Sequence, residues 1–233
     1  MSYKDNPSYI ETKSKTQKAT ADRVLNVLTN SGFTAVCAGG APRDWYLGRI
    51  AKDLDFFVDK KSKTNTEFEV EDFFKILGKG VAIFNTELEQ SGMYESNPRL
   101  KQVYEFEFED QTCQLIITQP SIADYEEDRI LNPAWDIHKT FPVNVSKATY
   151  RADSNFKYGL EYTDDFKYGH QFKILDFNEE FLYNDFYKRK IRRKFKDYAI
   201  VLRKVKPEIV DGLDYLQDCT NIRLKGRKLK QKG

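Results

Sequence analysis

Two aspartates set two positions apart, Asp53 and Asp55, are the strongest candidates for chemistry in this sequence. The run 54–58 is expected to form a strand, so both carboxylates would project from one face while Leu54 and Phe56 turn toward the core. Two carboxylates on one face repel unless a cation lies between them. Hard oxygen ligands at this spacing suit Mg²⁺ carried by the phosphates of a nucleotide. The pair therefore predicts a magnesium site that handles phosphates.

A glycine pair, Gly39 and Gly40, precedes the first aspartate, with residues 41–52 in between. The pair stands between a buried strand expected at 34–38 and a helix expected from Pro42, a favourable first-turn residue. Backbone N–H groups left bare there would face an anion, because the helix dipole favours negative charge at that end. A phosphate cradle beside a divalent-metal clamp indicates phosphoryl transfer.

The whole stretch resembles the signature of the nucleotidyltransferases of the DNA polymerase β superfamily. Its longer form, GGxxRDxxxGxxxxDxD, is similar to the head domain of class II CCA-adding enzymes and bacterial poly(A) polymerases. The sequence matches that form at Gly39, Gly40, Arg43, Asp44, Gly48, Asp53 and Asp55. The resemblance covers about residues 20–145 and is strong only over 36–58.

The resemblance implies an α+β, polymerase β-like nucleotidyltransferase fold. In that fold, a mixed sheet carries helices packed on one side, and here a small helical C-terminal part follows. Gly39 and Gly40 would hold the triphosphate of an NTP such as ATP. Arg43 would steady the phosphates or brace the loop, and Asp44 belongs to the same nucleotide-binding group.

The resemblance also assigns roles to the two aspartates. Asp53 and Asp55 would bind two Mg²⁺ ions, with Mn²⁺ as a possible substitute. One ion would activate the acceptor hydroxyl and the other would bridge the phosphates. The attack would be in line on the α-phosphate, with pyrophosphate leaving.

A third carboxylate, usual on a neighbouring strand in this family, is missing from its expected place, which is occupied by Gln114. A neutral amide cannot replace a carboxylate without loss. Strands at 103–108 and 113–118, joined by a four-residue turn, form an antiparallel hairpin that would set Glu107 opposite Gln114. Our hypothesis is that Glu107 supplies the missing charge and is catalytic. The alternative is that Glu105 and Glu107 line the wet face of an edge strand.

A second family motif, RRDFTINA, has a faint echo in residues 139–145. Phe141 and Asn144 align with it, whereas Thr140 replaces its aspartate. Since this segment helps to hold the nucleotide in the family, Asn144 is a candidate nucleotide-binding residue. The base-reading EDxxR motif is absent, so no base preference is carried over.

Charge is unevenly spread along the chain. Residues 187–233 hold 16 basic and 5 acidic residues, which leaves 22 basic and 31 acidic residues in the first 186. A basic amphipathic helix is expected from Asn184 to Val205. Its cations could lie along an RNA backbone, whose phosphates need no base reading: Lys188, Arg189, Arg192, Arg193 and Lys196. The alternative is a solvated helix with a frayed tail.

The composition narrows the class of protein. With 233 residues, 40% hydrophobic and 14% aromatic, the chain can bury a sizeable core. No apolar run approaches the roughly 20 residues that span a bilayer, so we expect no membrane association. The first residues contain no apolar run of the kind found in secretory signals, so we expect none. Three distant cysteines without a CxxC pattern and two scattered histidines argue against disulfides or zinc and favour the cytoplasm.

These observations predict a flexible lead-in at 1–19, a nucleotidyltransferase domain at 20–145 and a C-terminal part at 146–233 with strands, a basic helix and a basic tail. The predicted function is metal-dependent transfer of an NMP from an NTP to a hydroxyl, with an RNA, tRNA-like 3′ end as acceptor. One alternative is transfer to a small molecule or protein, because fold does not determine the acceptor. Another is a degenerate domain that only binds nucleotide or RNA.

Overall fold

The computed structural model describes residues 6–60, 66–78, 82–84, 99–119, 133–152, 157–178 and 185–201. The chain forms two compact units. The first unit joins Met1–Thr140 to Lys147–Tyr162, and the second joins Phe141–Ser146 to Thr163–Gly233. This differs from the division expected near residue 145, because two strands C-terminal to that point belong to the sheet of the first unit.

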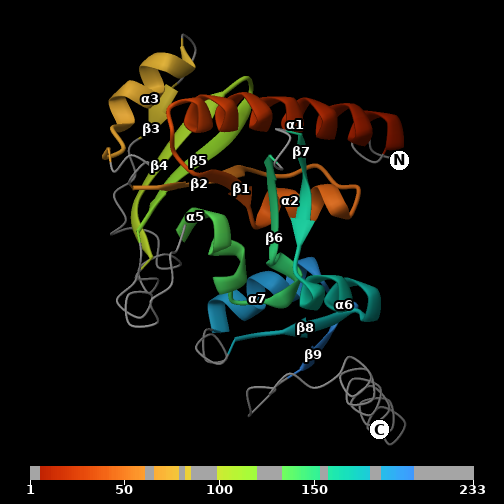
Figure 1. The fold of residues 1–233 in the computed structure, drawn as a ribbon. Helices are drawn as coiled ribbons and strands as arrows, with labels where there is room; N and C mark the ends of the chain where they lie inside the picture. The colour runs from red at the N-terminus through yellow and green to blue at the C-terminus, as the bar shows by residue number, and fades with distance from the viewer. Residues whose placement is uncertain are drawn as a thin grey trace, which may run out of the picture. The chain divides into compact units, whose positions relative to one another are not determined.

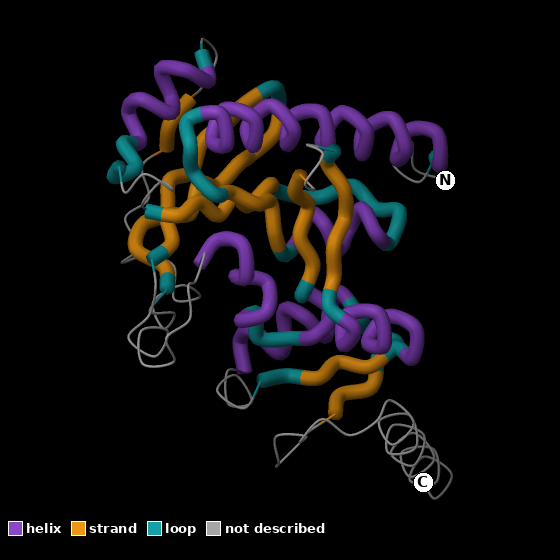
Figure 2. The backbone as a smooth tube through the Cα atoms, in the orientation of Figure 1, coloured by secondary structure: helices purple, strands orange, loops and turns teal. Residues whose placement is uncertain are grey.

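A seven-stranded mixed sheet forms the first unit (Figures 1 and 2), with strand order β3-β4-β5-β2-β1-β6-β7. The pair β2–β5 is parallel, and all the other neighbours are antiparallel. The strands are β1 (Ala35–Ala38), β2 (Leu54–Asp59), β3 (Ala82–Phe84), β4 (Leu100–Phe108), β5 (Gln111–Thr118), β6 (Ala148–Ala152) and β7 (Tyr158–Tyr162). The α+β fold class is therefore confirmed.

The longest helix begins much earlier than the sequence indicated. α1 spans Pro7–Asn30, so most of the expected lead-in is helical. Asn6 caps it by accepting a hydrogen bond from the Ser8 backbone N–H at 3.0 Å, and Pro7 occupies the first turn. Both are strong start signals, and they lie outside the apolar pattern that marks a helix only from Thr20.

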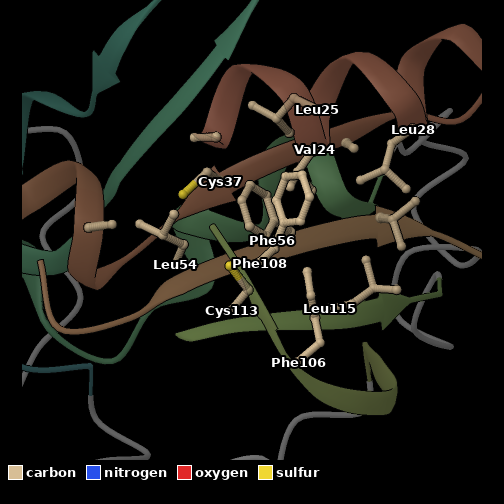
Figure 3. Close-up of a cluster of buried hydrophobic side chains, with 14 of the residues drawn as sticks. Val24, Leu25, Leu28, Cys37, Leu54, Phe56, Phe106, Phe108, Cys113 and Leu115 are labelled. Atoms are coloured by element: carbon tan, nitrogen blue, oxygen red, sulfur yellow. The ribbon is translucent and has the colours of Figure 1, made fainter. Parts of the chain in front are cut away.

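Three helices pack on one face of the sheet: α1, α2 (Gly40–Tyr46) and α3 (Val70–Leu77). Phe56 of β2 is fully buried on this face, and Val24 and Leu25 of α1 lie over it (Figure 3). Cys37 and Cys113 are buried in the same cluster, as expected for small apolar side chains.

The other face of the sheet meets a short helix. α5 (Pro133–Asp136), continued by a 3₁₀ turn at Ile137–Thr140, lies against the end of β2, where the Ala134 N–H donates to Asp59 Oδ1 at 2.7 Å. Successive residues of a strand point to opposite faces. Asp55, next to the core residue Phe56, therefore belongs to the face that α5 contacts and not to the core.

The β4–β5 hairpin is tighter than expected. Its turn has two residues, Glu109 and Asp110, with φ of 52° and 57°, and Phe108 pairs with Gln111. Two left-handed residues make the turn type that matches strand twist in a hairpin. Thr20 of α1 donates to the Glu109 carboxylate at 2.8 Å and ties the turn to that helix. The expected four-residue turn is therefore wrong.

The second unit contains α6 (Asp164–Phe172), α7 (Asp185–Lys194), a 3₁₀ turn at Asn144–Ser146 and a parallel pair of short strands, β8 (Ile174–Asp176) and β9 (Ala199–Val201). α7 ends well before Val205 because the chain turns to form β9. The sequence also predicts a short helix at about 208–217, which lies outside the described residues.

The repeated tetrapeptide FKYG adopts two different structures. Tyr158 and Gly159 of the first copy lie in β7, whereas the second copy, 166–169, is helical. The sequence pattern predicts a strand end at each copy. This prediction is wrong for the second copy, because Thr163 caps α6 by accepting from the Phe166 N–H. Among the described helices, none is long and apolar enough to cross a bilayer.

Candidate active site

The glycine turn joins the end of β1 to the start of α2. Gly39 has φ of 83°, a conformation that glycine adopts without strain. Its N–H donates to the Ala148 carbonyl of β6 at 3.0 Å, so this group is used in the fold. The N–H groups of Gly40 and Ala41 begin the helix and have no acceptor within it. The two N–H groups without an acceptor in the helix are therefore those of Gly40 and Ala41, and not those of Gly39 and Gly40 as expected.

The first aspartate meets this turn. A Cβ placed on Gly40 would lie 3.9 Å from Asp53 Oδ1 and 3.8 Å from the terminal nitrogen of Arg43. The glycine, the carboxylate and the guanidinium therefore converge at one point, although Asp53 lies 13 positions after Gly40 in the chain. A side chain larger than alanine at residue 40 would occupy the space between them.

Arg43 and Asp44 form a buried ion pair under the turn. Arg43 Nε donates to Asp44 Oδ1 at 3.1 Å, and the terminal nitrogen lies 3.4 Å from Oδ2. Both side chains are less than a tenth exposed. The pair joins adjacent residues of α2. Both roles expected for Arg43, steadying the phosphates and bracing the loop, therefore stay predictions.

The two aspartates differ in their surroundings. Asp53 is about one-third exposed and lies 3.5 Å from the solvated Lys52 ammonium, an ion pair that contributes little. Asp55 is half-buried at the start of β2. Burial, and next the Asp55 charge, raise the pKa of the Cys37 and Cys113 thiols. Both cysteines therefore stay protonated at neutral pH, which makes them poor nucleophiles.

Glu107 is not opposite Gln114. The register pairs Glu107 with Thr112 and places Glu105 opposite Gln114. The difference follows from the two-residue turn, which shifts the pairing by two residues. β4 is also not an edge strand, because β3 pairs with its outer side. Glu105 is thus the carboxylate beside Gln114, and the hypothesis about Glu107 loses its geometric basis.

Asn144 lies in the second unit, and its side chain is committed to structure. Its Nδ2 donates to the carbonyls of Asp165 and Ile174, each at 3.3 Å, and its Oδ1 accepts from the N–H groups of Val145 and Asp176 at 2.8 and 3.0 Å. The two donors and the carbonyl are therefore used within this unit. These contacts give the expected nucleotide-binding role of Asn144 no support.

The candidate RNA-binding residues lie on α7 and just beyond it, also in the second unit. Arg189, Arg192, Arg193 and Lys196 are exposed, and Lys188 is half-buried. Ile191 and Phe195 are buried between them, so the helix is amphipathic as expected. Tyr187 and Tyr198 take structural roles, because the first is buried against Phe177 and the second bonds to His170 at 2.9 Å.

Gln17 supports the site and was missed by the sequence analysis. It is 2% exposed on α1, and its amide bonds to both the N–H and the carbonyl of Ala51, at 3.0 and 2.9 Å. It also accepts from the Trp45 indole and donates to Gln111. These bonds fix the loop just before Asp53. The sequence carries one signal for this role: Gln17 precedes Val24 by seven residues, which places both on the apolar face of the helix.

The chemistry of the donor set fits a hard cation. Asp53 and Asp55 offer carboxylate oxygens only, which is the ligand type that Mg²⁺ prefers. Within the described ranges, no group of three histidine, cysteine, aspartate or glutamate side chains is placed to hold a metal ion.

No known sequence family matches the chain, and no curated protein matches it in sequence. Solved structures match its fold. A tRNA-processing enzyme in an apo form has a TM-score of 0.53 at 13% identity, covering 80% of this chain and 44% of that one. A CCA-adding enzyme in complex with CTP gives 0.53 at 11% identity, with 87% and 44% covered. The Thermotoga maritima CCA-adding enzyme complexed with tRNA gives 0.50 at 10%, with 86% and 41% covered.

These similarities establish the fold. The chain has the nucleotidyltransferase fold found in CCA-adding enzymes, which confirms the resemblance drawn from the glycine–aspartate motif at the level of architecture. The chain spans less than half the length of each of these enzymes.

Proposed function

We propose that this chain is a metal-dependent nucleotidyltransferase that transfers a nucleoside monophosphate from an NTP to a hydroxyl at an RNA 3′ end. The observation that carries the proposal is the convergence of Gly40, Arg43 and Asp53, with Asp53 Oδ1 3.9 Å from the Cβ position of Gly40. This brings a carboxylate to a turn whose first helical N–H groups have no partner in the helix. The fold shared with CCA-adding enzymes supports the same reaction class.

In this proposal, Asp53 and Asp55 hold divalent cations, Mg²⁺ or Mn²⁺. When bound, these cations stabilise charge on the phosphates and lower the pKa of the acceptor hydroxyl. The N–H groups of Gly40 and Ala41 bind the triphosphate, and Arg43, held by Asp44, keeps the turn in place. A bond forms between the acceptor oxygen and the α-phosphorus, the bond to the β-phosphate oxygen breaks, and pyrophosphate leaves.

An RNA acceptor is proposed because two independent features favour a polyanion. The exposed cations of α7 offer phosphate contacts without base reading. A structure of similar fold is a CCA-adding enzyme complexed with tRNA. Tyr187 and Tyr198 are not part of the proposed contact, since both are held within the fold.

The test is incorporation of label. The full chain is incubated with each α-labelled NTP, Mg²⁺, total RNA and a protein extract, and the products are then separated. We expect label in the RNA fraction. Label in protein or in small molecules would replace the proposed acceptor, and nucleotide binding without any transfer would point to a degenerate binding domain.

Removing either aspartate should abolish transfer without unfolding the protein. Asp53→Asn and Asp55→Asn should each lower the initial rate at least about 100-fold, because each removes a negative ligand oxygen from the reaction centre. Asp72→Asn is the matched control, since Asp72 is an exposed carboxylate of α3 paired with Lys75. A variant at residue 53 or 55 that keeps most of the control rate would contradict the assignment.

A further inference from the structure

Three polar side chains form a row across the centre of the sheet. Asp55 of β2 pairs with Gln114 of β5, and Gln114 pairs with Glu105 of β4. Directly paired residues project from the same face of a sheet. This is the face opposite the core, because Phe56 and Leu115, the next residues along β2 and β5, are fully buried in the core cluster. Gln114 therefore stands between two carboxylates.

The middle residue of this row has a determined orientation. Gln114 Nε2 donates to Glu105 Oε2 at 3.4 Å. An ionised carboxylate only accepts hydrogen bonds, so the amide nitrogen and not the carbonyl oxygen must face Glu105. The carbonyl oxygen of Gln114 is then the amide atom that does not bond to Glu105, and Asp55 of β2 is the neighbour of Gln114 on the other side by register.

We propose that Gln114 Oε1 is a third oxygen ligand, beside the carboxylates of Asp53 and Asp55, for a divalent cation, and that Glu105 is the positioning residue that orients it. This inference rests on the proposed function, because the two aspartates are the metal-binding pair of that proposal. Amide oxygens are accepted ligands of hard cations. The arrangement explains how the site forms without a third acid in the place where Gln114 stands.

An independent observation indicates that this face meets a polar group. Thr149 of β6 pairs with Ala38 of β1, and the β1–β2 register continued by one residue sets Ala38 opposite Asp55. Thr149 is fully buried, and its hydroxyl has no hydrogen-bond partner among the described residues. A buried hydroxyl left unpaired is costly, and an ordered water or an ion is one explanation for such a group.

The ligand role is tested by binding of Mn²⁺ alone to the full chain, followed by electron paramagnetic resonance. Gln114→Met, which keeps the length of the side chain but removes the oxygen, should raise the Kd about 10-fold or more. Gln114→Glu, which keeps an oxygen at this position and adds a negative charge, should lower the Kd. Asp72→Asn is the control, because Asp72 is an exposed carboxylate of α3 paired with Lys75, and it should bind as the wild type does.

The positioning role of Glu105 needs a readout that a structural role would not move. Glu105→Gln should weaken Mn²⁺ binding about 10-fold, as is typical for partners of metal ligands, because an amide no longer dictates which end of Gln114 faces it. The double variant Glu105→Gln with Gln114→Glu exchanges the two side chains, so the exchanged pair still contains one amide donor and one carboxylate. It should restore binding at least to the wild-type level.

The outcomes separate this inference from the proposed function. A folded wild-type chain that binds no Mn²⁺, with or without a non-hydrolysable NTP analogue, overturns the metal-dependent function itself. Wild-type binding that is unchanged in Gln114→Met overturns the ligand role. Binding in the exchanged pair that is no better than in Glu105→Gln overturns the positioning role. Circular dichroism of each variant establishes that it is folded.

Discussion

Asp59, at the end of β2, is a carboxyl group whose protonation should affect stability. It is 6% exposed, and its Oδ1 accepts hydrogen bonds from the Ala134 N–H at 2.7 Å and the Thr118 hydroxyl at 3.1 Å. Burial outweighs these bonds and raises the pKa of Asp59 to about 6. The native state therefore holds a proton that the unfolded state releases near pH 4.

The sign of the pH dependence follows from this difference. Between about pH 4 and pH 6 the native state binds more protons, so the free energy of unfolding falls as the pH rises, by up to about 3 kcal/mol from this group. Asp59→Asn cannot titrate and lacks this contribution. Urea denaturation of both proteins from pH 4 to pH 8 measures the difference, and parallel profiles would show that Asp59 is not responsible.

Gln17 should be critical for stability although it is polar. Gln17→Leu leaves the buried Ala51 N–H and carbonyl and the Trp45 indole without their present partner. We expect a loss of about 3 kcal/mol in the free energy of unfolding, because unsatisfied buried polar groups keep their desolvation cost. Gln171→Leu, an exposed glutamine of α6, is the control and should change it by less than about 0.5 kcal/mol. Equal effects would refute this role.

At the scale of elements, the two copies of FKYG provide a matched pair of glycines. In α6, a Cβ on Gly169 would lie 2.4 Å from Asn144 Nδ2 and 3.0 Å from a Val145 methyl group. In β7, a Cβ on Gly159 would meet nothing within 4 Å. Gly169 therefore allows α6 to pack closely on the 3₁₀ turn at Asn144–Ser146, whereas Gly159 has no such role.

Gly169→Ala should lower the free energy of unfolding by about 1–3 kcal/mol, because the methyl group displaces an asparagine that makes four hydrogen bonds. Gly159→Ala should be within about 0.5 kcal/mol of the wild type. Thermal denaturation followed by circular dichroism compares the two. A Gly169→Ala protein as stable as Gly159→Ala would mean that the turn at Asn144 moves freely to make room.

The elements also show what sequence reasoning could reach. The strand–turn–helix at Gly39 and the strand bearing Asp55 were predictable, because glycine, proline and alternating apolar residues are local signals. The register of the β4–β5 hairpin was not, since its two-residue turn places Glu109 and Asp110, neither of them glycine, at positive φ. The pairing of β6 with β1 also depends on contacts that no local pattern encodes.

On the scale of the whole molecule, charge is segregated along the sequence, with 16 of the 38 basic residues in the last 47 positions. Basic side chains that neutralise RNA phosphates release the counterions bound to them, so the affinity of the protein for RNA should fall steeply as the salt concentration rises. We expect a triple variant to reduce the slope of the logarithm of the RNA binding constant against the logarithm of salt concentration by about 2. The variant combines Arg192→Ala, Arg193→Ala and Lys196→Ala, and each phosphate that is no longer neutralised accounts for about 0.7 of the slope. Fluorescence anisotropy with a labelled single-stranded RNA measures this slope.

The control for that measurement replaces three lysines of the first unit, Lys15, Lys75 and Lys139, each paired with a neighbouring acid. Their replacement should leave the slope unchanged. A slope that is flat in the wild type, or one that falls equally in both triple variants, would mean that the cations of α7 do not bind the RNA.

The strand order has a consequence for how the protein is made. β2 acquires its antiparallel neighbour β1 from residues already synthesised, but its parallel neighbour β5 emerges only after α3, β3 and β4. A nascent chain halted before β5 would carry Asp53 and Asp55 on an unfinished sheet edge, without Gln114 beside them. We therefore expect affinity for divalent cations to appear only after β5 has been synthesised, at the step when β2 gains its second neighbour.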